Sequence, residues 1–388
     1  MPNVQSIAVL GSTGSVGTSC LDVIRSHPER MRAVGLSAYR SISELRQQVA
    51  EFQPDWAVLG AVGADEGGVA SGSTNHCDST NWHWNLDVIP RLVRQPEIDT
   101  VLSAVVGAAG LPAAVAAVDA GKRLAIANKE TMVVAGSLIV ERAAATGALL
   151  LPVDSEHCAI FQCLQSGRRQ DVRRIVLTAS GGPFRGWTRG QMSGVTPAMA
   201  LRHPTWKMGR KITVDSATMM NKALEVVEAR WLFGIPADQI TVVIHPQSQI
   251  HSFVEYRDGS VISQMSPPDM RLPIQYAFTY PERLECPARG SDWQVPLTLE
   301  LLPPDLEAFP ALGLGFEVAR QGGTSGVVLN AANEVAVARF LSGELRFDQI
   351  TQVVEEVLHH HQFDARPTLE QLMRLDDWSR KEAFQWKT

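Results

Sequence analysis

The chain has 388 residues, which favours two or three domains, because a single hydrophobic core rarely grows past about 250–300 residues. A hydrophobic fraction of 45% and a charged fraction of 20% are typical of a water-soluble globular protein. The formal net charge of −6 provides no overall basic footprint, so we expect no nucleic-acid partner.

The cysteines and the N-terminus indicate a cytoplasmic protein. The cysteines are odd in number, scattered and without a CxxC pair, which argues against a disulfide framework or a thiolate zinc site: Cys20, Cys77, Cys158, Cys163 and Cys286. The opening residues, MPNVQSIAVLGSTG, lack a basic region before their strand pattern, so we predict no targeting peptide. Residues 101–118 carry no charge, but glycines and a proline interrupt them. We predict a buried strand and a packed helix there and no membrane span.

A nucleotide-binding turn is predicted at residues 6–17. An apolar strand pattern leads into Gly11, Gly14 and Gly17, and a helix pattern follows. This G-x-x-G-x-x-G spacing is close to the dinucleotide fingerprint, in which glycines let the backbone approach a pyrophosphate at a helix N-terminus. The second strand, residues 32–37, is followed by Arg40 and Ser41 and by no acid. That pattern favours the 2′-phosphate of NADP, with a solvent-facing arginine as the alternative.

Further strands are predicted at residues 56–59, 100–104, 124–127 and 149–153, with a helix at 111–120. Residues 60–85 are rich in Gly, Ser, Asn and Asp, and we predict a surface loop. Four residues within them could ligate a metal by type, but their spacing matches no standard site: His76, Cys77, Asp78 and His83.

Polar residues follow two of these strands, at the edge where parallel sheets bind ligands. Asn128, Lys129 and Glu130 come directly after the strand LAIA. Asp154 and Glu156 follow the strand at 149–153, and in an extended segment their side chains share one face. Adjacent carboxylates repel unless a cation separates them, and oxygen ligands favour Mg²⁺ or Mn²⁺. A solvated turn is the alternative.

The stretch at residues 211–230 carries the densest set of polar groups. We predict a short strand through Ile212 and Val214, then a helix from about Met220 that Ser216 or Thr218 caps. Helical spacing places Asn221, Lys222 and Glu225 on one side of it, and its N-terminus suits a phosphate. A carboxylate beside a bound anion requires a cation between them. A capped amphipathic helix with an internal Lys–Glu pair is the alternative.

Several other segments are predicted to support this region. Ser180, Gly181 and Gly182 form a second anion-binding turn, and the loop at 202–210, with Trp206 and Met208, forms a lid. Residues 240–254 and 261–265 are paired strands around a turn at 257–259, on which His245 and His251 serve sheet packing or a partner contact.

The C-terminal third begins with many prolines at residues 266–310, which predict an extended linker. Helical patterns at 316–321, 327–341, 347–360 and 368–384 predict a small antiparallel bundle. His359–His361 end a helix, where cations complement the dipole, and we predict no metal site there.

The predicted fold class is α/β, with a Rossmann-like NADPH domain at residues 1–150 and an α/β (α+β) catalytic domain with a lid loop at 151–290. A linker at 291–313 and a C-terminal α-helical bundle at 314–388 complete the expected organisation.

In this order, the motifs closely resemble the 1-deoxy-D-xylulose 5-phosphate reductoisomerase family from end to end. The segments that carry the resemblance are GSTGSVG, ANKE, LPVDSEH, SGGPFR, HPTWKMGRK, VDSATMMNKALEVVEARWLF, IHPQSQIHS, SPPDMRLPI and NAANEVAVA. The resemblance implies a homodimer that uses NADPH and a divalent cation, Mg²⁺ or Mn²⁺, to make 2-C-methyl-D-erythritol 4-phosphate in the non-mevalonate isoprenoid pathway. Retro-aldol/aldol chemistry and a direct 1,2-shift both fit these residues.

The resemblance also implies roles for individual residues. It implies cofactor contacts at Thr13, Gly14, Ser15, Val16, Asn128, Glu130 and Gly209, to which the residues after the second strand add Arg40 and Ser41. It implies metal ligands at Asp154, Glu156 and Glu225, which with Lys129 form the catalytic set. It implies substrate contacts at Lys129, Ser155, Glu156, Ser180, His203, Trp206, Ser216, Asn221, Lys222 and Glu225.

The chain departs from the family pattern at Tyr39-Arg40-Ser41 and across residues 60–85. Two other functions fit the nucleotide-binding turn. A different NADP-dependent dehydrogenase, of the phosphorylating kind, needs a nucleophilic cysteine with a histidine partner, and no family motif surrounds Cys158. A non-catalytic NADP sensor needs neither three metal-capable carboxylates nor a phosphate site.

Overall fold

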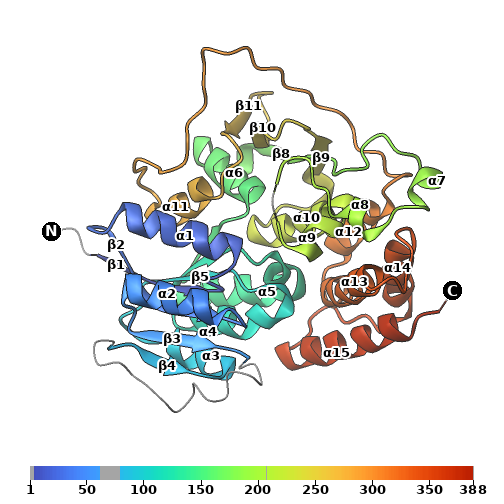
Figure 1. The fold of residues 1–388 in the computed structure, drawn as a ribbon. Helices are drawn as coiled ribbons and strands as arrows, with labels where there is room; N and C mark the ends of the chain where they lie inside the picture. Colours follow the sequence, from blue (N-terminus) through green and yellow to red (C-terminus); the bar gives the residue numbers. More distant parts are fainter. Residues whose placement is uncertain (1–3, 62–78, 207, 388) are drawn as a thin grey trace. The chain divides into compact units, whose positions relative to one another are not determined.

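The computed structural model describes residues 4–61, 79–206 and 208–387 (Figure 1). Within these residues the chain forms two compact units. The first comprises Met1–Asn128, Glu141–Asp154 and Asp269–Arg289, and the second Lys129–Val140, Ser155–Pro268 and Gly290–Thr388. Helix α5 (Lys129–Thr146) begins in the second unit and ends in the first. Two of the unit boundaries, after Asp154 and after Arg289, lie close to those expected at 150 and 290, and the second unit includes the linker and the C-terminal helices.

The first unit is built on a parallel sheet, as the spacing of its strand patterns predicts. The strands are β1 (Gln5–Leu10), β2 (Met31–Ala38), β3 (Trp56–Leu59), β4 (Asn81–His83), β5 (Thr100–Ser103), β6 (Arg123–Ile126) and β7 (Leu149–Pro152). Their order across the sheet is β4-β3-β2-β1-β5-β6-β7. The order reverses between β1 and β5, and open α/β sheets bind their ligands at such a switch point.

Burial explains why these short segments form strands. Ile7, Ala8, Val9 and Leu10 of β1 are each 0% exposed, as expected for a strand covered on both faces. Its neighbours β2 and β5 are largely buried as well, and Leu10 pairs with Ser37 of β2 and with Ser103 of β5. The uncharged segment at 101–118 is the buried strand β5 and a packed helix, as predicted. No helix in the described part of the chain is long and apolar enough to cross a membrane.

The predicted loop at 60–85 was wrong for its last part, because β4 lies there and pairs with β3 in parallel. The strand has only Asn81, Trp82 and His83, too few residues to display a period, and Trp82 stacks on Trp84 at 5.8 Å. His76, Cys77 and Asp78 lie outside the described residues.

Helices complete the first unit: α1 (Ser15–Ser26), α2 (Ile42–Phe52), α3 (Ile89–Leu92), α4 (Leu111–Asp119) and α11 (Arg271–Thr279). Helix α11 corrects the expectation of a continuous linker at 266–310, since Pro273 lies in its first turn, where proline is tolerated. It packs against α1, and His27 Nε2 lies 3.1 Å from Gln275 Oε1 and 2.9 Å from the Glu285 carbonyl oxygen. This proline-rich segment thus returns to the first unit.

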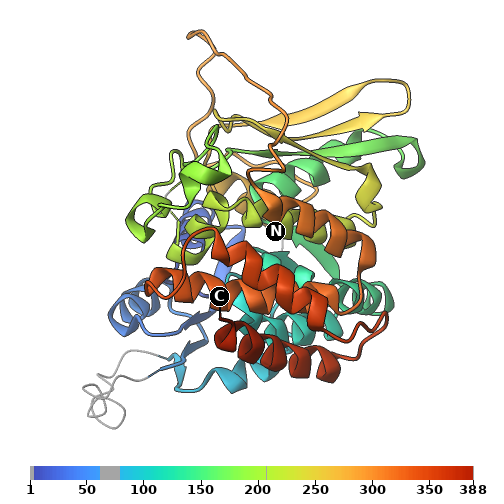
Figure 2. The same cartoon turned by 90° about the vertical axis from the view of Figure 1, so that its right-hand side faces the viewer.

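The second unit contains a mixed sheet of β8 (Val172–Ala179), β9 (Ile240–Ile244), β10 (Ile250–Tyr256) and β11 (Val261–Met265), in the order β11-β10-β8-β9. The predicted hairpin is β10 with β11, seen as a long ribbon in Figure 2. Strand β9 instead pairs in parallel with β8. His245 and His251 are buried: His245 Nε2 accepts from the Gln249 and Ile250 amides, and His251 Nε2 lies 3.1 Å from Ser266 Oγ. Both histidines therefore contribute to packing around the mixed sheet, which is one of their two predicted roles.

Helices surround this sheet and carry the polar residues of interest. They are α6 (Ser155–Cys163), α7 (Arg189–Met192), α8 (Pro197–Ala200), α9 (Arg210–Ala217) and α10 (Met220–Leu232). Two predictions were wrong here. Glu156 lies in the first turn of α6 rather than in an extended segment, and the predicted strand through Ile212 and Val214 is the helix α9. Tertiary contacts override the β-branched pattern, because α9 packs against a C-terminal helix.

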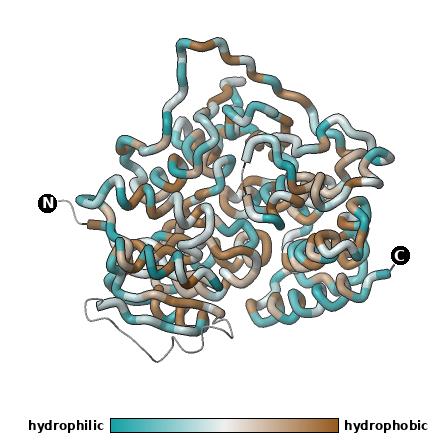
Figure 3. The backbone as a smooth tube through the Cα atoms, in the orientation of Figure 1, coloured by the Kyte–Doolittle hydropathy of each residue, from teal (hydrophilic) through white to brown (hydrophobic). Residues whose placement is uncertain are grey.

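The C-terminal helices form as predicted: α12 (Pro310–Gln321), α13 (Ser325–Leu341), α14 (Gln349–His360) and α15 (Leu369–Gln385). Helix α13 packs against both α14 and α15, and α12 packs against α10. The linker residues 290–309 loop away from the mixed sheet, and Figure 3 shows hydrophobic and hydrophilic residues alternating along them. Within this linker, Leu302 exchanges two backbone hydrogen bonds with Ile244 of β9.

Candidate active site

The glycine turn lies between β1 and α1, at the switch point of the sheet. Gly11 has a φ of +82°, and Gly14 is the N-cap of α1. A Cβ on Gly17 would lie 2.2 Å from the Gly11 carbonyl oxygen, so only glycine lets the helix approach the turn this closely. Thr13, Gly14, Ser15 and Val16 form the entry to α1, where backbone amides without helical partners can receive a pyrophosphate.

Arg40 and Ser41 lie where β2 ends and α2 begins. Both are exposed, and the Arg40 guanidinium lies over the Tyr39 ring at 5.2 Å from its centroid. In contrast, Asn128 is 3% exposed and its Nδ2 donates to the carbonyl oxygens of Val105 and Gly107. Its side chain therefore fixes the loop after β5, beside the switch point.

Glu225 is the centre of the polar cluster in the second unit. Its side chain is 1% exposed, and it lies one turn into α10. Asn221 Nδ2 donates to Glu225 Oε1 at 2.5 Å, and Lys222 Nζ makes a short contact with Glu225 Oε2. The prediction that these three residues share one side of the helix is confirmed. Helix α10 starts after Met219, whose φ is +63°, and Thr218 Oγ1 accepts from the Met220 amide. Of the two residues predicted to cap this helix, Thr218 makes a bond to its first amide and Ser216 makes none.

Two further elements bring charge to Glu225. Lys129, the first residue of α5, donates from Nζ to Glu225 Oε1 at 2.9 Å and is 6% exposed. Glu156 of α6 has a carboxylate oxygen within 4.8 Å of one on Glu225, and its Oε1 lies 3.9 Å from Lys222 Nζ. Ser155 Oγ donates to Glu156 Oε2 at 2.8 Å. The chain passes from the first unit to the second directly after Asp154, so connectivity keeps Asp154 two residues from Glu156.

The donor set of this cluster fits a divalent cation. Burying a carboxylate is costly unless positive charge compensates it, and at Glu225 two ammonium groups do so. Carboxylate oxygens from separate helices are the ligands that Mg²⁺ and Mn²⁺ prefer. The Oδ1 atom of Asn221 is buried and has no hydrogen-bond partner among the described residues, so it is open to a ligand's donor.

A second polar group gathers around the turn at residues 180–182. Ser180 Oγ accepts from the Gly182 amide and lies 3.1 Å from His203 Nε2. Gly182 has a φ of +65°, and a Cβ there would lie 2.6 Å from the Ser216 carbonyl oxygen. The glycine therefore brings the turn against the end of α9, so that Ser180, His203 and Ser216 come together in one region.

His203 has a defined tautomer in this region. Its Nδ1 accepts from the amides of Thr205 (3.1 Å) and Trp206 (2.9 Å), so the proton is on Nε2, which donates to Ser180 Oγ. Burial lowers the pKa of His203 below its usual value. Protonation of Nδ1 would remove the acceptor for both amides. The neutral ring therefore holds Trp206 of the predicted lid, whose Met208 and Gly209 lead into α9.

We expect the affinity for substrate to depend on pH through His203. The pKa of His203 is lower in the folded protein than in the unfolded chain, so the neutral ring stabilises the folded loop. This stabilisation is complete above about pH 6.5 and is lost as the pH falls through the pKa of the folded protein. A two-dimensional NMR titration should give His203 a pKa below about 6.5, and the substrate KM should rise over the same interval. Glutamine keeps an acceptor that does not titrate, so His203→Gln should flatten this rise relative to the native chain. An identical pH profile in the variant would contradict this role.

A buried ion network that the sequence reading missed lies beside the cluster. Lys211 Nζ lies 3.0 Å from Glu130 Oε1 and 2.8 Å from Asp215 Oδ2, and Asn333 Nδ2 of α13 donates to Asp215 Oδ1 at 2.9 Å. Burial opposes charge on Lys211, yet Asp215 and Glu130 raise its pKa. Burial would likewise raise the pKa of Glu130, but Lys211 holds it below its usual range. The spacing of Lys211 and Asp215, four residues apart, is the signal that could have revealed the network.

Asn333→Ala should lower the free energy of unfolding by about 1–3 kcal/mol, because Asp215 Oδ1 loses its buried donor. Urea denaturation followed by circular dichroism measures the change. The control variant is Arg374→Ala, because Arg374 is exposed on α15. A loss in Asn333→Ala no larger than that in the control would mean that this contact does not stabilise the fold.

His157 and Glu228 are a second pair that sequence reasoning did not identify. Both are fully buried, with His157 Nδ1 3.5 Å from Glu228 Oε2. His157 Nε2 donates to the Glu225 carbonyl oxygen at 3.0 Å, which joins the helix of Glu156 to the helix of Glu225. His157 directly follows the predicted metal ligand Glu156 in α6, and Glu228 follows the predicted ligand Glu225 by one turn in α10. This spacing is the sequence signal that could have revealed the pair.

A doubly wound nucleotide-binding sheet, joined to a unit with a buried cluster of acids and lysines, defines a nicotinamide-dependent oxidoreductase with a separate catalytic unit. Sequence models of the 1-deoxy-D-xylulose 5-phosphate reductoisomerase family match residues 7–136, and models of its C-terminal domains match residues 150–233 and 265–382. The chain belongs to this family.

Relatives and solved structures agree along nearly the whole chain. The chain is 47% identical to 1-deoxy-D-xylulose 5-phosphate reductoisomerase of Rhodopirellula baltica, over 98% of this chain and 94% of the relative. It is 49% identical to that of Symbiobacterium thermophilum, over 98% of both. The Zymomonas mobilis enzyme in complex with NADPH has a TM-score of 0.91, 40% identity and 98% coverage of both chains. A DOX-P reductoisomerase in complex with NADPH, fosmidomycin and magnesium has a TM-score of 0.91 and 38% identity, covering 98% of this chain and 97% of that one.

Proposed function

We propose that the protein converts 1-deoxy-D-xylulose 5-phosphate to 2-C-methyl-D-erythritol 4-phosphate in the non-mevalonate isoprenoid pathway, using NADPH and a divalent cation. The observation that carries this proposal is the convergence of Glu156, Lys129 and Lys222 on the buried carboxylate of Glu225. The end-to-end family match supports the same reaction. The solved relatives bound to NADPH, magnesium and fosmidomycin support the same cofactors and a small phosphorylated substrate.

In this proposal Asp154, Glu156 and Glu225 hold the cation. When bound, NADPH would supply the hydride and the cation would supply Lewis-acid polarisation of the substrate. Lys129 orients the Glu225 carboxylate through its 2.9 Å contact. Ser155 orients Glu156 in the same way through its 2.8 Å hydrogen bond. The His157 contact to the Glu225 backbone keeps the two ligand-bearing helices in register.

The substrate phosphate is assigned to the Ser180 turn, Ser216 and the first turns of α10. Lys222 supplies the positive charge there, since its ammonium lies between Glu225 and Glu156 and can turn toward an anion. Binding at this remote group positions the reacting carbons. His203 holds the Trp206 backbone, so the lid excludes water when it closes over the substrate.

The nucleotide is assigned to the first unit, with its pyrophosphate at Thr13, Gly14, Ser15 and Val16 and its 2′-phosphate at Arg40 and Ser41. Asn128, Glu130 and Gly209 complete the proposed cofactor contacts. Arg40 has no ion pair among the described residues, so its charge is available to a phosphate.

Arg40→Ala should raise the KM for NADPH by about 10–100-fold, the worth of a charge-assisted phosphate contact. The KM for NADH should change little, because that cofactor has no 2′-phosphate. Initial rates of absorbance loss at saturating substrate measure both values. The exposed Arg91 on α3 supplies the control variant Arg91→Ala. An equal effect on both cofactors would show that Arg40 does not bind the 2′-phosphate.

We also infer a homodimer, with a second copy seated on the mixed sheet and the linker. Val295, Leu297, Leu299 and Leu301 alternate along the linker and are 39–58% exposed. Val261 and Ile262 of the edge strand β11 are exposed as well. Exposed alternating apolar residues beside a strand edge mark an association surface. Sedimentation equilibrium should give twice the chain mass, and a monomer at micromolar concentration would refute the inference.

We place the protein in the cytoplasm, because Cys20, Cys158 and Cys163 are buried free thiols that fit a reducing compartment. Burial raises the pKa of Cys163 to about 11, which leaves it unreactive. Cell fractionation with an antibody to the protein checks this location, and recovery in a membrane or periplasmic fraction would contradict it.

The alternatives, another NADP-dependent dehydrogenase or an NADP sensor, are not favoured. The Cys158 thiol is buried and lies 3.3 Å from Gln162 Nε2, so it is a poor nucleophile. NADPH absorbance is the test: with the deoxyxylulose phosphate and Mg²⁺ or Mn²⁺ it should fall, and a chelator should stop the reaction. Substrate-dependent oxidation that a chelator does not affect would exclude the proposed metal dependence.

A further inference from the structure

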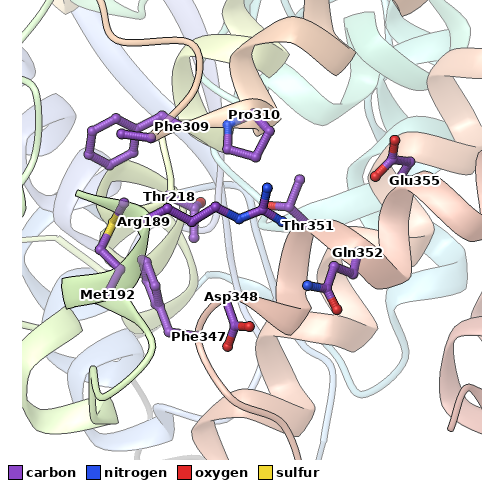
Figure 4. A pocket seen from close by; sticks show the side chains of 11 residues that line it. Arg189, Met192, Thr218, Phe309, Pro310, Phe347, Asp348, Thr351, Gln352 and Glu355 are labelled. Carbon is purple, nitrogen blue, oxygen red and sulfur yellow. The ribbon is translucent and has the colours of Figure 1, made fainter. Parts of the chain in front are cut away.

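A cavity of about 190 Å³ lies in the second unit, apart from the residues assigned to substrate and metal (Figure 4). Helix α7 contributes Arg189 and Met192, and helix α14 contributes Thr351 and Gln352. Its other lining residues are Thr218, between α9 and α10, and Ala308, Phe309, Pro310, Phe347, Asp348 and Glu355. Nothing in the proposed reaction uses this space.

One side of the cavity is apolar and rigid. Met192, Phe309 and Phe347 are 3%, 7% and 4% exposed. The Phe347 ring packs edge-on against Phe184 at 5.2 Å and against Phe340 at 5.7 Å. A wall fixed by packed rings suits a flat or compact apolar group, because no side chain has to be ordered on binding.

The other side is polar and includes Arg189, which is exposed to solvent. Figure 4 shows the Arg189 side chain reaching across the cavity toward Thr351. Arg189 makes no ion pair or hydrogen bond through its side chain with any described residue. The Gln352 amide likewise has no described partner, so both groups have donors to offer an anion.

Two acids on the wall limit the charge of a ligand. Asp348 is already paired, with both its oxygens 3.0 Å from the Arg346 guanidinium. Glu355 is exposed and lies on the far side of Thr351 from Arg189 in Figure 4. Their negative charge disfavours a doubly charged phosphate more than a single carboxylate. The space is close to that of a cavity that accepts benzene, so only a small ligand fits.

We propose that this cavity is a second ligand site, which takes a small monocarboxylate with an aromatic or compact apolar body. The carboxylate is held by Arg189 with Gln352, and the body lies against Phe309, Phe347 and Met192. Guanidinium groups bind planar carboxylates through paired donors, which gives the site its preference for this anion.

Occupancy of the cavity is coupled to the substrate site through Thr218. This residue is 5% exposed, lines the cavity and accepts from the Met220 amide at 3.3 Å. Met219, next to it, has the left-handed φ of +63°, so the turn that starts α10 is conformationally constrained. Asn221 and Lys222 follow directly. A ligand against Thr218 therefore changes the affinity for substrate, a consequence that rests on the proposed function, whereas binding to the cavity does not.

Three probes of one size test the site on the full chain: benzoate, benzyl alcohol and benzylammonium. Ligand-observed NMR should show benzoate binding with a Kd near or below the millimolar range, and the other two at least about tenfold more weakly. Arg189→Met should abolish the preference, and Gln352→Leu should weaken benzoate in the same direction. The exposed Arg374 of α15 gives the matched control Arg374→Met, and Lys222→Met tests for binding at the substrate site instead. Both variants should bind benzoate like the native chain.

Equal binding of the three probes, tighter binding of benzylammonium, or benzoate affinity that survives Arg189→Met would each overturn the proposed ligand class. Loss of benzoate binding in Lys222→Met would assign it to the substrate site and overturn the second site. For the coupling, saturating benzoate should change the substrate KM at least about threefold in the native chain and not in Arg189→Met. An unchanged KM at saturation would overturn it.

Discussion

Glu225→Gln is expected to lower kcat by a factor of about 10³ or more, while NADPH still binds. The substitution keeps the shape of the side chain but removes the negative charge on which the cation, Lys129 and Lys222 depend. Lewis-acid stabilisation is worth several kcal/mol in the transition state, and each 1.4 kcal/mol is a factor of ten in rate. Steady-state kinetics with Mg²⁺ and nucleotide fluorescence measure the two quantities separately.

The same variant also leaves two buried ammonium groups without their shared carboxylate, so folding has to be checked alongside. Removing one partner of a buried ion pair costs about 3–5 kcal/mol, and thermal denaturation should show a lower Tm. Glu317→Gln, on an exposed position of α12, is the matched control and should leave kcat and Tm unchanged. A folded Glu225→Gln variant with near-native kcat would rule out Glu225 as a metal ligand.

Lys222→Met is expected to raise the KM for the phosphorylated substrate by about 10–100-fold. A charge-assisted hydrogen bond to a phosphate contributes about 1.5–3 kcal/mol, and methionine retains the packing of the aliphatic stem without the charge. The ammonium is 5% exposed and held by Glu225 and Glu156, so it is already positioned at the first turn of α10.

A substrate without its phosphate distinguishes this role from a general loss of activity. If Lys222 binds the phosphate, Lys222→Met should lower the turnover of 1-deoxy-D-xylulose by a smaller factor than the turnover of the phosphorylated substrate. Lys381→Met, on an exposed position of α15, controls for the loss of a surface charge. Equal losses with both substrates would mean that Lys222 supports the cation site and not the phosphate.

The first unit was predictable because its strands are short, buried and regularly spaced. Residues 7–10 are apolar without interruption, and Gly17 follows where the helix closely approaches the turn. The C-terminal helices were predictable for a related reason, since their apolar residues repeat at helical spacing over three turns or more. In both cases the local pattern and the tertiary packing agree.

The wrong predictions of secondary structure fall where the local sequence pattern and the tertiary packing disagree. The alternation of Ile212 and Val214 is a strand pattern, but Asp215 needs Asn333 of α13 and Lys211 four residues earlier, and only a helix satisfies both. In the same way, Glu156 in the first turn of a helix is not visible from a sequence in which polar residues follow a strand. The secondary structure of these segments depends on residues that are distant in the sequence, and a single sequence does not show which distant residues interact.

The polar cluster itself was only partly visible from the sequence. Asn221, Lys222 and Glu225 share a helix, so their spacing alone placed them together. Lys129 and Glu156 come from other helices, and their approach to Glu225 follows from packing within the second unit. The supporting pairs, His157 with Glu228 and Lys211 with Asp215, have only their spacing as a sequence signal, and the fold was needed to show that they interact.

The proposed reaction couples a rearrangement of the carbon skeleton to NADPH oxidation. Carbon-13 NMR of the product formed from uniformly labelled 1-deoxy-D-xylulose 5-phosphate, NADPH and Mg²⁺ tests it most directly. We predict the branched skeleton of 2-C-methyl-D-erythritol 4-phosphate, with one carbon bonded to three others, in proportion to the NADPH consumed. A straight-chain polyol phosphate, the product of simple ketone reduction, would contradict the account.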